Sequence, residues 1–341
     1  MKRSIACFLL MALLLTGCAK VSKQEQKQYT ATFLDLFDTM TSIVGKADSG
    51  EAFRQQAQLL HDELLEYHQL FDIYNDYDGL VNLKTVNDQA GIAPVTVDGK
   101  IIALLKDCQN YYDLTEGRVN VAMGSVLNLW HEAREAGIND PVNASLPQQD
   151  KLEAATEHTG IESLVIDEEA STVYLTDPEA KLDVGAVAKG WSAQWVCENA
   201  PSGLLVSVGG NVCATGPKDE TGTPWVVGVQ DPDGGEAYLH TLYLTKGSIV
   251  TSGDYQRAYV VDGKTYHHII DPDTLYPGTW WRSVTVLCED SGLADALSTA
   301  LFLLPKDEGQ ALLEEAGAEA MWVDAEGNCF YSAGFESRIR T

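Results

Sequence analysis

The sequence predicts an α+β fold, in which helices flank mixed or antiparallel sheets. Segments with helical spacing of apolar residues cluster in the first half of the 341-residue chain, and short strand-like segments dominate the second half. Early helices followed by a run of strands are typical of α+β proteins rather than of a doubly wound parallel sheet. The chain shows no internal repeat and no low-complexity region.

The N-terminal segment is typical of an export signal. Two basic residues precede an apolar stretch over 5–15, and the sequence then reads Leu15-Thr16-Gly17-Cys18. The apolar stretch is shorter than the ~20 residues that a membrane-spanning helix needs. The last four residues resemble the lipobox of bacterial lipoproteins, whose cysteine is acylated; the alternative is an ordinary signal with an incidental cysteine. We therefore expect a lipoprotein signal peptide at 1–17, lipidation at Cys18 and a lipid-anchored protein on the extracytoplasmic face of the bacterial cell membrane.

The next residues predict a tether that leads into one folded unit. Residues 18–30 are rich in Lys and Gln and nearly lack large apolar side chains, so they cannot bury enough surface to fold. The remaining residues, 31–341, suffice for one large domain or two lobes with a substantial core. Residues 31–45 should form a strand or hairpin arm at its start.

Three helices are expected before the strand-rich half. Apolar residues recur at helical spacing over 51–71. Asp98 is placed to cap a second helix over 100–112, and a third helix should run from Ser145 to Gly160.

Short apolar runs bounded by turn residues predict the later strands. These runs cover 163–166, 172–175, 203–208, 225–229, 237–244, 259–261 and 283–287. Asp262-Gly263 follows one of them and is a type I′ hairpin signal. Two helices should interrupt the strands, one over 187–199 and one over 293–304 that Ser291 caps and Pro305 ends.

The charge balance excludes a nucleic-acid role. The chain has 50 acidic and 23 basic residues, for a formal charge of −27, which repels a phosphate backbone. A phosphate-bearing ligand would need a metal or a lysine placed close to it to offset this field. Five cysteines remain beyond the lipobox, with no Cys-x-x-Cys pair, and we expect buried free thiols rather than one or two disulfides.

Two Gly-containing segments are candidates for ligand contact. Residues 181–190 combine a strand ending at Asp183, a small-residue turn and a helix with Lys189 in its first turn. That order lets the backbone approach a ligand and aim N–H groups at an anion, although small residues also serve ordinary packing. The turn Gly209-Gly210-Asn211 follows a buried strand, and its composition is common in turns without a ligand.

Two further segments carry groups suited to proton transfer or metal binding. His267 and His268 are expected on a strand, where their side chains point to opposite faces, so at most one faces a given cleft. That one could be a general base or simply a solvated histidine. Asp295 and Thr299 lie four apart on an expected helix and could share a Mg²⁺ ion; the alternative is an Asp that stabilises a helix N-terminus.

Together these segments resemble the ApbE family of FAD:protein FMN transferases. The resemblance covers nearly the whole chain after the tether and implies a single two-lobed domain with a ligand cleft between the lobes. It rests on five motifs in the same order: Leu182-Asp183-x-Gly185-x-x-Ala188-Lys189-Gly190, Gly209-Gly210-Asn211, Thr251-Ser252-Gly253-Asp254-Tyr255-x-Arg257, His268-Ile269-Ile270-Asp271-Pro272 and Ala294-Asp295-Ala296-Leu297-Ser298-Thr299.

The resemblance also implies roles for single residues. FAD would be contacted by Met40, Tyr74, Ala122, Met123, Gly124, Asp183, Lys189, His268 and Ile269. The Ala186 carbonyl, Asp295 and Thr299 would bind Mg²⁺, and the catalytic residues would be His268 and Asp295. Two segments depart from the family pattern: Met40-Thr41-Ser42 stands where Met-Gly-Thr is frequent, and Asp273-Thr274-Leu275-Tyr276 replaces the usual Arg-Thr-Gly. The second departure affects any acceptor or phosphate contact in that loop.

The implied function is a Mg²⁺-dependent transfer of FMN from FAD to a Thr or Ser hydroxyl of a membrane-associated acceptor protein. The products would be a phosphoester-linked flavoprotein and AMP. Two alternatives remain at this point. One is an FAD pyrophosphatase that releases FMN and AMP, and the other is a lipoprotein that binds flavin without turnover.

Overall fold

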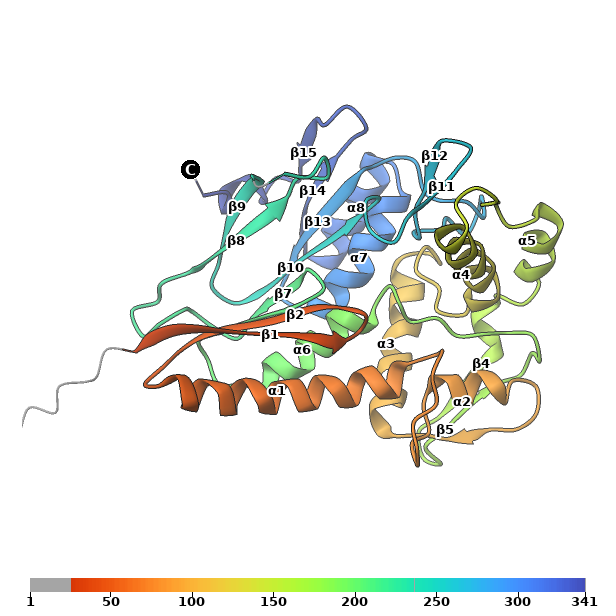
Figure 1. Ribbon diagram of the computed structural model, residues 1–341, viewed down its shortest axis with the longest axis horizontal. Coiled ribbons are helices and arrows are strands. Elements are labelled where there is room, and N and C mark those ends of the chain that lie inside the picture. The colour runs from red at the N-terminus through yellow and green to blue at the C-terminus, as the bar shows by residue number, and fades with distance from the viewer. Residues whose placement is uncertain (1–25, 236, 341) are drawn as a thin grey trace, which may run out of the picture.

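An eight-stranded antiparallel sheet forms the centre of the molecule (Figure 1). The computed structural model describes residues 26–235 and 237–340. In spatial order the strands are β1 (Lys27–Leu36), β2 (Thr39–Ala47), β6 (Leu204–Val208), β7 (Asn211–Ala214), β10 (Gly247–Gly253), β13 (Ser283–Cys288), β14 (Glu319–Val323) and β15 (Cys329–Tyr331).

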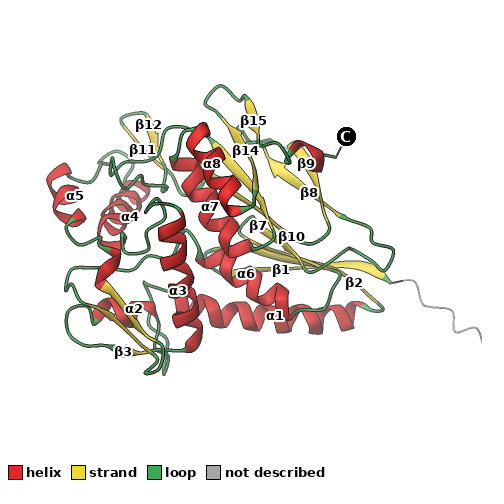
Figure 2. Ribbon diagram, turned by 180° about the vertical axis from the view of Figure 1, so that it is seen from behind, coloured by secondary structure: helices red, strands yellow, loops and turns green. Residues whose placement is uncertain are grey.

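Helices cover one face of this sheet, and a hairpin covers part of the other (Figures 1 and 2). The helices on the first face are α1 (Gly50–Phe71), α6 (Ala188–Asn199), α7 (Ser291–Leu303) and α8 (Lys306–Ala316). The other face carries the hairpin β8 (Trp225–Gln230) and β9 (Tyr238–Leu244) and the short helix η2 (Glu336–Arg338). Trp225, Leu242 and Phe335 pack there against Met321 of the sheet, as a second apolar cluster.

A second lobe lies beside one end of the sheet (Figure 1). It consists of α2 (Leu83–Asp88), α3 (Gly99–Leu114), α4 (Gly124–Asn139), α5 (Gln149–Thr156), η1 (Ile161–Ser163), a small sheet of β3 (Val95–Thr96), β5 (Thr172–Leu175) and β4 (Leu164–Asp167), and the hairpin β11 (Tyr259–Val261) and β12 (Lys264–Tyr266). One apolar core continues from Leu104 of α3 through Leu64 of α1 to Val206 and Leu297. The two lobes therefore share one core, and the expected α+β fold with antiparallel sheets is confirmed.

Local signals account for several element boundaries. The side chain of Asp98 accepts a hydrogen bond from the Lys100 N–H, which confirms it as the cap of α3. Asp262 and Gly263 both have positive φ, 50° and 78°, and join β11 to β12 as a type I′ turn.

Three expected boundaries are corrected. Strand β1 begins at Lys27 rather than at 31, because Tyr29 stacks on Phe53 of α1 and ties this end of the strand to the core. The third helix covers only Gln149–Thr156, and His158 beyond it bonds to Asp177 at 2.8 Å. Helix α7 is capped by Asp290, whose carboxylate accepts the Leu293 N–H at 2.8 Å, rather than by Ser291.

The five cysteines within the described part of the chain are free, as expected, and Cys108, Cys197 and Cys213 are buried. Across the same residues, no helix combines the length and the apolar character that crossing a membrane requires. The signal peptide and Cys18 lie outside the described residues, so their assignment stays a prediction.

Candidate active site

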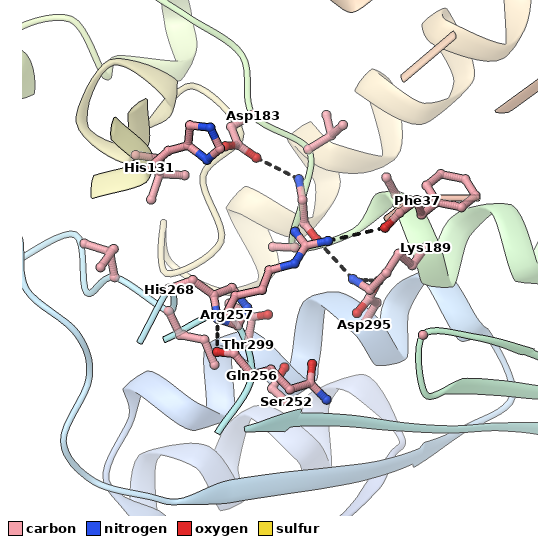
Figure 3. Close-up of a pocket in the computed structure, with 18 of the residues that line it drawn as sticks. Phe37, His131, Asp183, Lys189, Ser252, Gln256, Arg257, His268, Asp295 and Thr299 are labelled. Carbon is pink, nitrogen blue, oxygen red and sulfur yellow. Dashed lines mark hydrogen bonds and ion pairs between the residues drawn. The ribbon is translucent and has the colours of Figure 1, made fainter. Parts of the chain in front are cut away.

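A cavity of about 560 Å³ lies between the two lobes. The sheet lobe contributes the turn between β1 and β2, the loop after β10, and Asp295 and Thr299 of α7. The other lobe contributes Tyr74 and one side of α4. Figure 3 shows side chains from these segments converging on the same space. The volume is that of a small-molecule or cofactor site.

The Asp295 carboxylate of α7 joins this helix to α6 and β7. It is only 4% exposed, and its Oδ2 accepts the Gly190 N–H at 2.8 Å and the Asn211 side-chain amide at 2.9 Å. The Lys189 ammonium lies 3.6 Å from the same oxygen. Burial raises the pKa of Asp295, and the Lys189 charge and the two hydrogen bonds oppose that rise. The carboxylate therefore fixes α6 and β7 against α7.

Gly190 is required by the close approach of α6 and α7. A Cβ at this position would overlap the Ser291 carbonyl oxygen and the Asp295 Cβ. The Gly190 N–H bonds to Asp295 instead of completing a helical bond to the Ala186 carbonyl four residues earlier. No described backbone N–H donates to that carbonyl, and Ala186 borders the cavity. The Ala186 carbonyl is therefore free to bind a ligand.

The Gly-Gly-Asn segment aims Asn211 at the same carboxylate. Gly209 and Gly210 have φ of 58° and 93° and form the two-residue turn between β6 and β7. Such a turn needs positive φ at both positions, which glycine adopts without strain. Asn211 follows as the first residue of β7, is 2% exposed and bonds to Asp295.

His268 presents one free ring nitrogen to the cavity. Its Nδ1 lies 3.2 Å from the Gln256 carbonyl oxygen, and because a carbonyl only accepts, Nδ1 carries the proton. Burial, with the charges of Arg257 and Lys189, lowers the pKa of His268 to about 3. The ring is therefore neutral at physiological pH, with Nε2 able to accept a proton.

His267 uses both ring nitrogens inside the protein. Its Nε2 donates to the Gly278 carbonyl at 2.9 Å, and its Nδ1 accepts the Ile269 N–H at 3.2 Å. The ring also packs edge-on against Phe302. The expectation that the two histidines alternate on a strand is wrong, because β12 ends at Tyr266 and both follow it in a loop. Hydrogen bonding, rather than strand alternation, distinguishes them.

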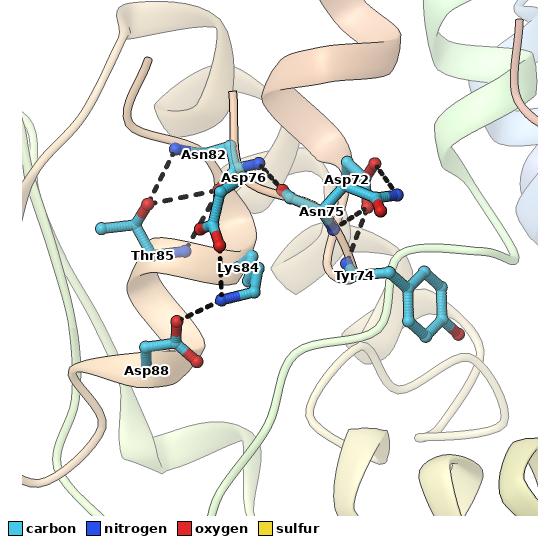
Figure 4. Close-up of polar contacts among 8 residues, drawn as sticks. All are labelled: Asp72, Tyr74, Asn75, Asp76, Asn82, Lys84, Thr85 and Asp88. Carbon is cyan, nitrogen blue, oxygen red and sulfur yellow. Dashed lines mark hydrogen bonds and ion pairs between the residues drawn. The ribbon is translucent and has the colours of Figure 1, made fainter. Parts of the chain in front are cut away.

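A hydrogen-bonded loop positions Tyr74 (Figure 4), which also lines the cavity. The Asp72 carboxylate accepts the N–H groups of Tyr74 and Asn75 at 2.6 and 3.0 Å and the Tyr77 hydroxyl at 2.7 Å. Held in this way, the Tyr74 ring stacks on His131 of α4, with centroids 4.8 Å apart and planes 28° apart. The pair offers a flat aromatic surface where the two lobes meet.

Most of the residues named from the sequence border this one cavity. These are Tyr74, Met123, Asp183, Ala186, Lys189, His268, Ile269, Asp295 and Thr299. Met40, Ala122 and Gly124 do not line it. Met40 occupies an outward position of β2 and is 58% exposed.

Ala122 and Gly124 belong to a segment that supports Asp183 from behind. The Asp183 N–H donates to the Val121 carbonyl at 2.8 Å, and the Gly124 N–H donates to the Lys181 carbonyl at 3.0 Å. A Cβ at Gly124 would overlap the Lys181 backbone. The segment around 121–124 therefore fixes the position of Asp183.

Several residues at the cavity received no role from the sequence. Arg118, His131, Arg134 and Gln256 all border it, and Arg257 was part of a motif without an assigned role. In the sequence, His131 and Arg134 of α4 have the pattern of an ordinary solvated helix face. Only the folded structure, which places them at the same cavity as Tyr74 and Asp183, marks them as candidates for the site.

Comparison with known proteins supports the interpretation of the motifs. A model described as the ApbE family matches residues 34–322. A protein of Treponema pallidum (strain Nichols), named FAD:protein FMN transferase, is 34% identical over 277 residues, which is 76% of this chain and 75% of the relative. A protein of Vibrio cholerae serotype O1 with the same name is 30% identical over 309 residues, or 89% of this chain and 88% of the relative.

Solved structures share the whole fold. The ApbE protein of Thermotoga maritima superposes with a TM-score of 0.81 at 30% identity, over 92% of this chain and 100% of that one. The flavin transferase ApbE from Vibrio cholerae has a TM-score of 0.76 at 25% identity, over the same shares. With the motifs and the family match, these similarities establish that the chain belongs to the ApbE family.

Proposed function

We propose that this protein is a transferase that moves FMN from FAD to a Ser or Thr hydroxyl of an acceptor protein and releases AMP. The observation that carries the proposal is one cavity in which Lys189 and Asp295 lie together with a histidine that has a free Nε2. Relatives that match most of the chain are named FAD:protein FMN transferase, which supports this reaction.

In the proposed reaction the acceptor hydroxyl oxygen attacks the phosphorus on the FMN side of FAD. The new phosphoester bond forms as the bond from that phosphorus to the bridging oxygen breaks, and AMP leaves with this oxygen. The Nε2 of His268 takes the hydroxyl proton. Lys189 offsets negative charge on the diphosphate, as phosphoryl transfer depends mainly on positioning and charge neutralisation.

The oxygen donors at the cavity fit Mg²⁺. Asp295 and Thr299 lie one helical turn apart on α7, and the Ala186 carbonyl accepts no bond from a described backbone N–H. Gly190, Asn211 and Lys189 all contact the Oδ2 atom of Asp295, and none of these three contacts involves the second carboxylate oxygen, Oδ1. The described residues contain no cluster of three His, Cys, Asp or Glu side chains, whereas Mg²⁺ binds through few carboxylates, water and substrate phosphate. When bound, the ion would neutralise charge on the phosphate groups.

The proposal extends to the cell envelope. An acylated Cys18 would hold the enzyme on the extracytoplasmic face of the membrane. Confinement to the same surface would raise the effective concentration of a membrane-associated acceptor. The sequence around Cys18 carries this part of the proposal.

The reaction itself is tested by incubating the protein with FAD, Mg²⁺ and a candidate acceptor protein from the same membrane. We expect AMP release together with flavin fluorescence on the acceptor after denaturing electrophoresis. AMP release without covalent flavin would identify an FAD pyrophosphatase. Bound FAD that stays intact would identify a flavin-binding protein, and either result overturns the proposed transfer.

Asp295→Asn tests the metal proposal, because it removes the carboxylate charge and keeps the side-chain volume. AMP release should fall by at least about 100-fold, as several kcal/mol of charge stabilisation are lost. EDTA should have the same effect on the unmodified protein. Asp307→Asn on the exposed start of α8 is the matched control and should retain full activity. Normal turnover of Asp295→Asn, or normal turnover in EDTA, would contradict the Mg²⁺ assignment.

The adjacent histidines form a matched pair. His268→Ala should slow transfer by roughly 10² to 10⁴, the range for loss of a general base, with a much smaller change in FAD affinity. His267→Ala should lower the melting temperature, because two hydrogen bonds and the Phe302 contact are lost, and transfer by the folded fraction should stay near normal. In-gel flavin fluorescence and FAD titration measure both. The reverse pattern, with His267→Ala inactive and His268→Ala active, would show that the base is misassigned.

Cys18→Ser should prevent acylation and release the protein from the membrane. Fractionation of cells into membrane and soluble material, followed by immunoblotting, measures the distribution. Cys7→Ser, which changes a cysteine inside the expected signal peptide, is the control and should leave the protein in the membrane fraction. If the Cys18→Ser variant stays as membrane-bound as the unmodified protein, the anchor is not at Cys18.

A further inference from the structure

Arg257 is a cation at the cavity that forms no ion pair with a carboxylate among the described residues, although its charge acts on Asp183 and opposes the rise in pKa that burial causes there. The other Lys and Arg side chains at the cavity all form such an ion pair. Lys189 pairs with Asp295, Arg134 with Glu135, and Arg118 with Asp271 and Asp273. Arg257 instead donates from Nη2 to the Phe37 carbonyl at 3.3 Å. In a chain with 50 acidic and 23 basic residues, a guanidinium left without a carboxylate leaves its charge available to an anionic ligand.

The backbone at Arg257 is held in an unfavourable conformation. Its φ is +45°, in the left-handed region that residues other than glycine seldom adopt. The residue before it, Gln256, gives its carbonyl to His268. The loop between β10 and β11 therefore orients the proposed base and presents Arg257 to the same cavity (Figure 3). Backbone strain of this kind persists at functional sites when surrounding contacts over-determine it.

The present partner of Arg257 is a weak one. A neutral carbonyl at 3.3 Å is beyond the usual 2.7–3.2 Å range for an N–H donor, and charged acceptors bind a guanidinium more strongly. Phe37 lies at the turn between β1 and β2, where Phe37 and Asp38 also have positive φ. This turn borders the cavity as well. A phosphate group in the cavity could therefore replace the carbonyl at little cost.

We propose that Arg257 binds the diphosphate of FAD, as a second cation beside Lys189. The proposal rests on the transferase function proposed above and assigns a substrate contact to a residue outside that mechanism. A guanidinium presents a planar fork of N–H donors that matches two phosphate oxygens, which an ammonium group cannot do. The same charge contributes to the low pKa of His268, so a bound diphosphate that offsets it makes the ring a stronger base once substrate is present.

The test compares ligands with and without phosphate. Binding of FAD, ADP and riboflavin is measured by equilibrium dialysis for the unmodified protein, Arg257→Gln, Arg257→Lys and Arg54→Gln. Arg54 lies on the exposed side of α1, so Arg54→Gln makes the same change in net charge away from the cavity. Arg257→Gln should weaken FAD and ADP binding about 10- to 100-fold, the loss expected for hydrogen bonds to a charged group. Riboflavin binding should change less than about 2-fold, Arg257→Lys should be intermediate, and Arg54→Gln should bind all three ligands normally.

Two results would overturn the assignment. Unchanged FAD and ADP binding in Arg257→Gln would show that the guanidinium does not contact the diphosphate. An equal loss of riboflavin binding would show that Arg257 only shapes the cavity. Because binding is measured without an acceptor, a protein that binds FAD through Arg257 but transfers no flavin would refute the proposed function and leave this inference standing. If the unmodified protein binds FAD and ADP no better than riboflavin, the diphosphate adds nothing to binding and this assignment fails, whereas the proposed function is still decided by the assay of AMP and covalent flavin.

Discussion

The buried Asp295 carboxylate is the constraint on which the site depends. An ionised carboxylate removed from water is costly unless hydrogen bonds and an opposite charge compensate it. Here the compensation comes from Gly190, Asn211 and Lys189, which are 84 to 106 residues away along the chain. Two of them depend on glycine: Gly190 lies where two helices nearly touch, and a two-glycine turn precedes Asn211. The glycines at 190, 209 and 210 therefore serve one buried charge.

A second constraint is the electrostatic repulsion between an acidic protein and the negatively charged diphosphate of the proposed ligand. The formal charge of −27 makes the molecule as a whole repel a diphosphate, so binding depends on cations placed close to it. The cavity brings together Lys and Arg side chains from separate parts of the chain, most of them paired with a carboxylate. Pairing fixes a side chain in place but reduces its attraction for a ligand. Burial keeps His268 neutral and the charges of Arg257 and Lys189 add to that effect, so electrostatics and proton acceptance are coupled in this cavity.

Local physical signals explain what the sequence could predict. Helix α1 followed from apolar spacing, α3 from the Asp98 cap, and the β11–β12 hairpin from Asp262-Gly263, because each depends on residues close in the chain. Strands β10 and β14 had no such signal. Alternate residues of both strands pack into the apolar clusters on the two faces of the sheet, so these strands lack the alternation of a half-exposed strand. At the site, the motifs identified Asp295 and His268, whereas the stack of Tyr74 on His131 depends on tertiary packing that no local pattern encodes.

The loop at 273–276, which departs from the family pattern described above, carries an acidic residue that pairs with Arg118. Asp273 follows the Asp271-Pro272 pair and forms an ion pair with Arg118 at 2.6 Å. Arg118 also lies 3.3 Å from Asp271, so two carboxylates share one guanidinium at this edge of the cavity. An arginine already held between two acids has little charge left for a third anion. The 271–276 loop is therefore a poor site for a phosphate. The cations that remain to neutralise a bound diphosphate are Lys189 on α6 and Arg257 in the loop after β10.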